Sequence, residues 1–397
     1  LPLYPFFLAA VYKITGVSVL AVKWVQIFLG LVTLFLVYRT GLKLSGARAA
    51  FWGALIAATY GPLLFHAVIF IPEAPGVPLY AGAFLASLHV LDKPSVRSAV
   101  ILGVLFGLAA LAKAGIMLFV GCFLVYFAAT RKSLAKAALC LAAFLLTLAP
   151  VTAHNLLRGK DFVLMTSHAG FNFYVGNHPG AEGVFQAPEG TGSNVEAQRE
   201  DSRALAEKAL GGNLKPSEVS RYWSGLAWKF IRENPAEFLK LSMMKVALFF
   251  DAREISDVED YEFQKNFVPL LKFPWPGFML LGPLVFSGLF FASRSRYRVP
   301  LYLWIGCYVL GITAFFVNAR YRLPMLPAFF PVAALGALGI FDAWKERRWK
   351  EVSAGLLLLA AGVFVSQMRL VGTDFSRDNL NVGDAYVEKG QPREALP

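Results

Sequence analysis

The sequence predicts an all-α polytopic membrane protein with about ten transmembrane helices and one long, partly helical extracytoplasmic loop. The chain of 397 residues is 57% hydrophobic and only 16% charged, whereas soluble domains carry about 25% charged residues. Several apolar runs approach the ~20 residues that a helix needs to cross a ~30 Å hydrocarbon core. Helices are expected there, because an open sheet edge in lipid would leave backbone groups unpaired.

The apolar runs divide the chain into four regions. We expect transmembrane helices over residues 1–153, an extracytoplasmic loop with interfacial helices over 154–274, transmembrane helices over 275–370 and the start of a tetratricopeptide repeat region over 371–397. The expected spans are residues 18–38, 49–65, 74–91, 98–112, 114–130, 135–153, 275–293, 299–317, 323–343 and 351–369.

The net charge of +12 does not indicate a nucleic-acid-binding protein. The long loop holds 14 Lys or Arg and 16 Asp or Glu, so the loop is nearly neutral. The positive excess lies in short loops between apolar runs, as in the cytoplasmic loops of membrane proteins. The loops expected on the cytoplasmic side are residues 39–48, 93–97, 131–136, 294–298 and 345–350.

Alternation of sides places the long loop and the C-terminus outside an inner or plasma membrane, together with residues 1–17, 66–73 and 318–322 and Lys113. This orientation requires that residues 238–250 do not cross the bilayer. We therefore expect an interfacial or re-entrant helix over 236–250, with Asn234 as its N-cap and Pro235 at its first position.

Two further helices are expected in the long loop. Residues 197–210 form a polar helix that Gly211 and Gly212 end. Ser217 caps a second helix that runs to Glu233, with an apolar face at helical spacing. That face lies either on the membrane surface or on the loop's own core.

Glu73 stands out because residues 1–153 contain only two acids, Glu73 and Asp92. Asp92 is explained as a solvated charge at a cytoplasmic helix end. Glu73 lies at the outer mouth of a span, where a carboxylate is costly unless it is paired or hydrated. It is either a site residue, as metal ligand or substrate acceptor, or a helix N-terminal charge favoured by the macrodipole. As a site residue, it is expected to have Lys113 or the pair of Arg320 and Arg322 as its nearest basic partners.

Three cations lie on the outer face, against the usual charge distribution: Lys113, Arg320 and Arg322. Cations in such places indicate an anionic ligand, and the planar fork of Arg suits phosphate. The alternative is that Arg320 and Arg322 reach to lipid headgroups.

The other residue types give weaker signals. His66, His154, His168 and His178 fall outside in this topology, but their spacing matches no metal motif. The three cysteines lie in apolar runs, so no disulfide framework is expected. Near the C-terminus, Gly383, Tyr386, Gly390 and Ala395 match the first helix of a tetratricopeptide repeat, with an ordinary soluble tail as the alternative.

Together these features resemble the GT-C integral membrane glycosyltransferases. The similar branch holds the protein O-mannosyltransferases and the lipid A aminoarabinose transferase, in its bacterial type with C-terminal tetratricopeptide repeats. Residues 2–5, Pro-Leu-Tyr-Pro, resemble the Pro-Leu-Tyr element that ends the family's first outer loop. Glu73 matches an acid that often starts a helix after the next outer loop. The segment at Asn155 and residues 170–183 look like the long outer loop, and residues 320–324 resemble the Arg-Tyr-Arg-x-Pro element before a late span.

This resemblance implies transfer of a sugar from a polyprenyl-phosphate donor to a protein, lipid or glycan acceptor on the outer face. The family's catalytic Asp precedes the Pro-Leu-Tyr element, so we expect a fragment that begins after it. The catalytic base is therefore unknown, with Glu73 as a candidate site acid. The residues expected to bind the donor phosphate are Lys113, Arg320, Tyr321 and Arg322. The residues expected to line the substrate cavity are Tyr4, His66, Glu73, His154, Asn155, Asn172, Tyr174 and Asn177.

The expected partners are the lipid bilayer, the donor, the acceptor and proteins bound through the repeats, with no nucleic acid. No metal ligands are assigned, and a divalent metal stays an open alternative. Two other functions stay open as well. A secondary transporter would place ionisable residues at mid-membrane and show two repeated halves, whereas an O-antigen ligase or polymerase would also use an outer loop and arginines.

Overall fold

The computed structural model describes residues 2–192, 195–256, 260–368 and 370–372. Over these residues the chain is helical and has no β-strand, which confirms the all-α fold class. The expected repeat motif at Gly383–Ala395 lies outside the described residues.

The helices follow one another with short connections except in the long loop. The N-terminal elements are α1 (Leu3–Thr15), α2 (Val19–Ser45), α3 (Ala47–Ala58), α4 (Gly61–His66), α5 (Glu73–Asp92), α6 (Val96–Ala112), η1 (Ala114–Ile116), α7 (Met117–Arg131) and α8 (Leu134–Gly159). The loop holds α9 (Ala169–Gly176), α10 (Val195–Leu210), α11 (Pro216–Glu233), α12 (Pro235–Phe249), α13 (Tyr261–Gln264) and η2 (Pro269–Lys272). The C-terminal elements are α14 (Phe278–Ala292), α15 (Arg298–Thr313), η3 (Ala319–Met325), α16 (Leu326–Lys345) and α17 (Trp349–Ser366).

Among the described residues, 6 helices are long and apolar enough to cross a membrane. They are Val19–Ser45, Glu73–Asp92, Ala114–Arg131, Leu134–Gly159, Ala319–Lys345 and Trp349–Ser366. Three of the other expected spans correspond to the shorter apolar helices α6, α14 and α15. The most buried of the long helices are α5 and the continuous stretch of η3 and α16, so these two form the centre of the bundle.

The span expected over residues 49–65 is broken in two. Tyr60 is extended and Pro62 follows at the start of α4, so the helix cannot continue through this point. The break brings the backbone close to the long loop, since a Cβ added to Gly61 would lie 2.2 Å from Tyr261 Oη.

The ends of the first transmembrane region also differ from expectation. Residues 3–15, expected as part of an outer segment, form the apolar helix α1. Helix α8 continues beyond residue 153 to Gly159, so His154 and Asn155 lie on a helix and not in a loop.

The long loop contains the expected helices, and of the expected caps only that of Ser217 is wrong. Helix α10 ends at Gly211 and Gly212, both at positive φ, as expected. Helix α11 starts at Pro216, and Asp161 accepts hydrogen bonds from the Ser217 amide and hydroxyl at its N-terminus. Asn234 is the N-cap residue of α12, but its side chain makes no capping bond. Ser217 is not the cap because it lies inside the helix, one residue after Pro216, and Lys215 occupies the N-cap position.

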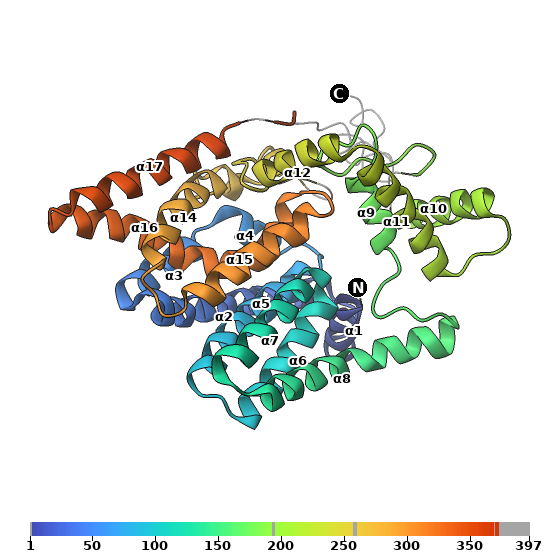
Figure 1. The fold of residues 1–397 in the computed structure, drawn as a ribbon, viewed down its shortest axis with the longest axis horizontal. Helices are drawn as coiled ribbons and strands as arrows, with labels where there is room; N and C mark the ends of the chain where they lie inside the picture. Colours follow the sequence, from blue (N-terminus) through green and yellow to red (C-terminus); the bar gives the residue numbers. More distant parts are fainter. Residues whose placement is uncertain (1, 193–194, 257–259, 369, 373–397) are drawn as a thin grey trace.

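The apolar face of α11 packs on the core of the loop. Trp223 is buried beside Phe171 and Val175 of α9 and Phe316, which follows α15. The exposed Trp228 lies beside this face. Figure 1 shows α9, α10 and α11 gathered at one end of the bundle, with the turn between α16 and α17 at the other end.

Charge pairs join several of the loops that are expected on the cytoplasmic side. Asp92 at the end of α5 binds Lys43 Nζ at 2.5 Å and Arg296 Nη2 at 2.8 Å. Arg48 of α3 binds Asp342 of α16 at 3.1 Å. These loops therefore meet at one end of the bundle, and the assignment of that end to the cytoplasm remains a prediction.

Cysteine labelling checks this orientation. A membrane-impermeant thiol reagent added to intact cells should modify a cysteine placed at Ala187 in the long loop and spare one placed at Ser295. The positive loops should stay inside because the Lys and Arg bias sets orientation. The native chain, with its three cysteines in apolar helices, gives the background, and both variants should react after lysis. Modification at Ser295 in intact cells would reverse the topology.

Candidate functional site

Three charged side chains from separate parts of the chain meet at the end of the bundle opposite Asp92. Glu73 is the first residue of α5. Lys113 lies between α6 and η1 in an extended conformation that interrupts the helix. Arg320 lies in η3, whose first turn is capped by the Asn318 side chain. Glu73, Lys113 and Arg320 are called the Glu73 cluster below.

The contacts within the Glu73 cluster are close. Lys113 Nζ lies 2.7 Å from Glu73 Oε1, and Arg320 Nη1 lies 3.9 Å from Glu73 Oε2. The ammonium of Lys113 is also 3.7 Å from the centre of the Tyr321 ring. Of the basic partners expected for Glu73, Lys113 and Arg320 are therefore in contact with it.

Burial differs among these side chains. The Glu73 side chain is 3% exposed, whereas those of Lys113 and Arg320 are 19% and 21% exposed. Glu73 Oε2 makes no hydrogen bond with any described residue. The cluster is therefore a buried carboxylate covered by two cations that remain partly accessible.

Two tyrosines that the sequence analysis missed fix the backbone around the cluster. The Tyr80 hydroxyl donates to the Lys113 carbonyl at 2.6 Å and accepts from the Ile116 amide at 3.0 Å. The Tyr308 hydroxyl donates to the Tyr321 carbonyl at 3.0 Å. Both lie inside apolar helices. The only signal for them in the sequence was therefore a tyrosine hydroxyl within an expected transmembrane span.

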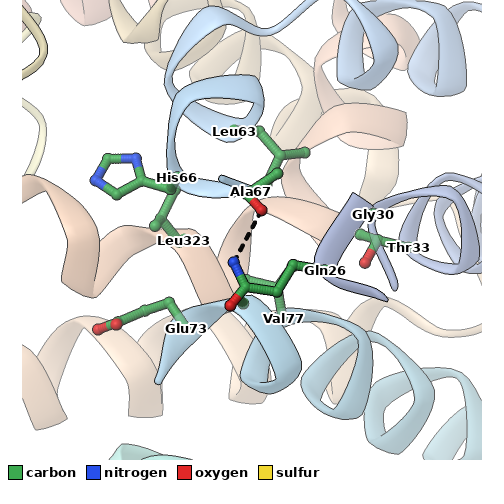
Figure 2. A pocket seen from close by; sticks show the side chains of 10 residues that line it. Gln26, Gly30, Thr33, Leu63, His66, Ala67, Glu73, Val77 and Leu323 are labelled. Atoms are coloured by element: carbon green, nitrogen blue, oxygen red, sulfur yellow. Dashed lines mark hydrogen bonds between the residues drawn. The ribbon is translucent and has the colours of Figure 1, made fainter. Parts of the chain in front are cut away.

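Beside the cluster, Tyr4 is hydrogen-bonded to Gln26 of α2, and His66 lines the same pocket as Gln26. Tyr4 Oη donates to Gln26 Oε1 at 3.0 Å, and Gln26 Nε2 donates to the carbonyls of Ala67 and Ile69. Gln26 thereby fixes the segment that leads to Glu73, a role the sequence did not reveal. Figure 2 shows Gln26 bonded to Ala67, with the His66 and Glu73 side chains extending to the same side. The pocket there has a volume of about 30 Å³.

His66 is neutral at pH 7. Its Nδ1 lies 2.7 Å from the Pro62 carbonyl, which can only accept, so Nδ1 carries the proton. Burial lowers the pKa of His66 to about 4. The ring can therefore accept a hydrogen bond through Nε2.

Arg322, expected at the phosphate site, is enclosed by other partners. Its guanidinium donates to the carbonyls of Phe249, Asp251 and Arg253 and to the Glu254 carboxylate, which lies at 3.1 Å. It also lies over the Phe278 ring, with 4.1 Å from Cζ to the ring centre. Through these hydrogen bonds the Arg322 guanidinium connects η3 to the end of α12 and the segment that follows it.

The expected cavity residues of the long loop lie in different settings. His154 is exposed on α8, and Asn155 Nδ2 donates to the Val163 carbonyl. Asn172 is half-buried on α9, and the half-buried Tyr174 ring packs 4.9 Å from that of Trp223. The Asn155 and Tyr174 side chains thus contribute to the structure of the loop itself.

Asn177 is fully buried and connects three elements. Its Nδ2 donates to the carbonyls of Phe173 and Ala314, and its Oδ1 accepts from Lys245 Nζ at 2.9 Å. Burial lowers the pKa of Lys245 to about 7. The sequence analysis missed Lys245, because its helix was read only for its apolar residues.

No group of three or more His, Cys, Asp or Glu side chains that could hold a metal occurs within the described ranges.

The fold and the site define a polytopic all-α membrane protein with a charged cluster at one end of its central helices. The profile of the dolichyl-phosphate-mannose-protein mannosyltransferase family matches residues 2–155, which include Glu73 and Lys113. No curated protein matches the chain.

Two solved structures are similar to the chain. One is the archaeal oligosaccharyltransferase AglB from Archaeoglobus fulgidus in complex with an inhibitory peptide and a dolichol-phosphate. It is 15% identical, with a TM-score of 0.45 over 98% of this chain and 51% of that one. The other is ArnT from Cupriavidus metallidurans in the apo state, 14% identical, with a TM-score of 0.34 over 86% of this chain and 68% of that one. The chain thus spans about half the length of AglB.

Proposed function

We propose that this chain belongs to a membrane glycosyltransferase that transfers a sugar from a polyprenyl-phosphate donor to an acceptor outside the membrane. The observation that carries the proposal is the convergence of Lys113 and Arg320 on Glu73, with both cations partly accessible. The match of residues 2–155 to the mannosyltransferase profile supports the same class.

The cluster suits the chemistry of such a transfer. When the sugar leaves its lipid carrier, negative charge develops on the departing phosphate. Cations fixed before the reaction stabilise that charge most effectively. In the proposed arrangement Lys113 and Arg320 contact the phosphate, while Arg322, occupied by Glu254 and three carbonyls, holds η3 in place.

Glu73 has a supporting role in this scheme. A carboxylate engaged by two cations is a weak proton acceptor. We therefore propose that Glu73 orients Lys113 and Arg320 and that another group takes the proton of the acceptor. His66, neutral and beside Glu73 in the pocket, can accept a hydrogen bond from a substrate hydroxyl.

Removing the guanidinium of Arg320 tests the proposal. Arg320→Ala should raise the free energy of the transition state by about 1.5–3 kcal/mol, the usual worth of a hydrogen bond to a charged group. Arg320→Lys should restore part of the loss, because Lys keeps the charge and lacks the fork. The measurement is transfer of labelled sugar from a polyprenyl-phosphate donor by the full-length protein in lipid.

Arg48→Ala is the matched control, since Arg48 also pairs with one acid but lies at the opposite end of the bundle. It should leave transfer unchanged. Normal turnover and donor affinity in Arg320→Ala would exclude Arg320 from the phosphate site. Absence of any labelled transfer by the native protein would favour a transporter.

A further inference from the structure

The Tyr321 ring faces both cations of the Glu73 cluster. Lys113 Nζ is 3.7 Å and Arg320 Cζ is 5.4 Å from the ring centre. Both distances fall within the ~6 Å range of a cation–π interaction. Lys113 and Arg320 are far apart in sequence, so this ring is a surface that the two cations share.

We propose that Tyr321 is a positioning residue whose ring directs Lys113 and Arg320 toward one anionic group, the phosphate of a polyprenyl lipid. This inference rests on the proposed function and adds a part to it. Tyr321 then makes no essential contact with the phosphate itself, and its hydroxyl is dispensable.

An aromatic ring suits this task better than a second carboxylate would. The ring attracts a cation through its quadrupole and carries no charge of its own. A carboxylate at the same place would neutralise the cations and compete with the phosphate for them. The Tyr321 ring can therefore hold both side chains while leaving their charge available to a ligand.

The surroundings of Tyr321 keep the ring in place. The Asn318 side chain accepts a hydrogen bond from the Tyr321 amide at 3.0 Å, and the Tyr308 hydroxyl donates to its carbonyl at 3.0 Å. Phe316 packs on the ring with 5.7 Å between centres. The backbone is thus fixed on both sides, so the ring is held before any ligand arrives.

Two substitutions separate the ring from the hydroxyl. Tyr321→Leu should weaken binding of a sugar-free polyprenyl phosphate by about tenfold, the factor expected for loss of desolvated cation–π contacts. Tyr321→Phe should bind within about twofold of the native protein, because the ring remains. In sugar transfer, Tyr321→Leu should raise KM for the donor more than it lowers kcat. Binding is measured with the full-length protein in lipid nanodiscs.

Tyr297→Leu is the matched control, because the Tyr297 ring also faces two cations, Lys43 and Arg296, but lies beside Asp92 at the other end of α5. It should leave lipid phosphate binding unchanged. If Tyr321→Leu fails to fold, Tyr321→Met replaces it in the same comparison.

The outcomes distinguish this inference from the proposed function. Native-like binding by Tyr321→Leu together with weak binding by Arg320→Ala would overturn the role of the ring and leave the phosphate site intact. Equal losses in Tyr321→Phe and Tyr321→Leu would also overturn it, since the hydroxyl would then be responsible. Native-like binding by both Arg320→Ala and Tyr321→Leu would remove the phosphate site itself.

Discussion

Glu73→Gln is expected to fold and insert normally and to lose most of its transferase activity. The amide keeps the shape of the side chain but loses the charge that attracts Lys113 and Arg320. The two cations then repel each other and move apart. A displacement of about 1 Å at a catalytic site can reduce the rate on the order of 100-fold.

Sugar transfer by the full-length protein measures this effect, and thermal unfolding in detergent checks the fold. Glu351→Gln is the matched control, because Glu351 also pairs with two cations, Arg294 and Arg348, near the start of α17. The control should transfer sugar at the native rate. Full activity in Glu73→Gln would reduce Glu73 to a helix-end charge.

Arg322→Ala is expected to have the largest effect on stability. The side chains of Arg322 and Glu254 are 3% and 7% exposed, so the pair is buried. Removing one member of a buried ion pair costs about 3–5 kcal/mol, because the remaining charge is left without its partner. Three carbonyls that accept from Arg322 would also lose their donor.

A double-mutant cycle with Glu254→Gln measures this pair. The double variant Arg322→Ala, Glu254→Gln should be more stable than Arg322→Ala alone, since no charge is left buried. Lowering the pH should also reduce the loss of stability in Arg322→Ala. Burial raises the pKa of Glu254, so the folded form of Arg322→Ala takes up a proton more readily than the unfolded chain, and its deficit should shrink as pH falls below neutral. Additive effects of the two substitutions would show that the contact is not coupled.

The sequence predicted the fold class and the Glu73 contacts because charges are rare in this chain. Glu73 is one of only two acids before residue 154, so few arrangements could satisfy it. The end of α10 at Gly211 and Gly212 could also be predicted from the sequence, because glycine adopts positive φ without help from distant residues.

The remaining features depend on contacts between distant residues. Arg320 and Arg322 looked equivalent in sequence, yet one faces Glu73 and the other faces Glu254. Asp161 caps a helix that begins more than 50 residues later. The roles of Gln26 and Tyr80 came from side chains inside helices, where periodicity indicates burial but not which backbone group a polar atom will meet.

The charge pairs around Asp92 have a mechanical consequence for the whole bundle. Asp92 ties α5 to Lys43 of α2 and to Arg296 in the turn before α15, far along α5 from Glu73 at its other end. Helices fastened at one end can separate only by pivoting about that end. In the proposed enzyme a lipid headgroup that enters beside Glu73 would therefore meet the helix ends that the Asp92 pairs do not join.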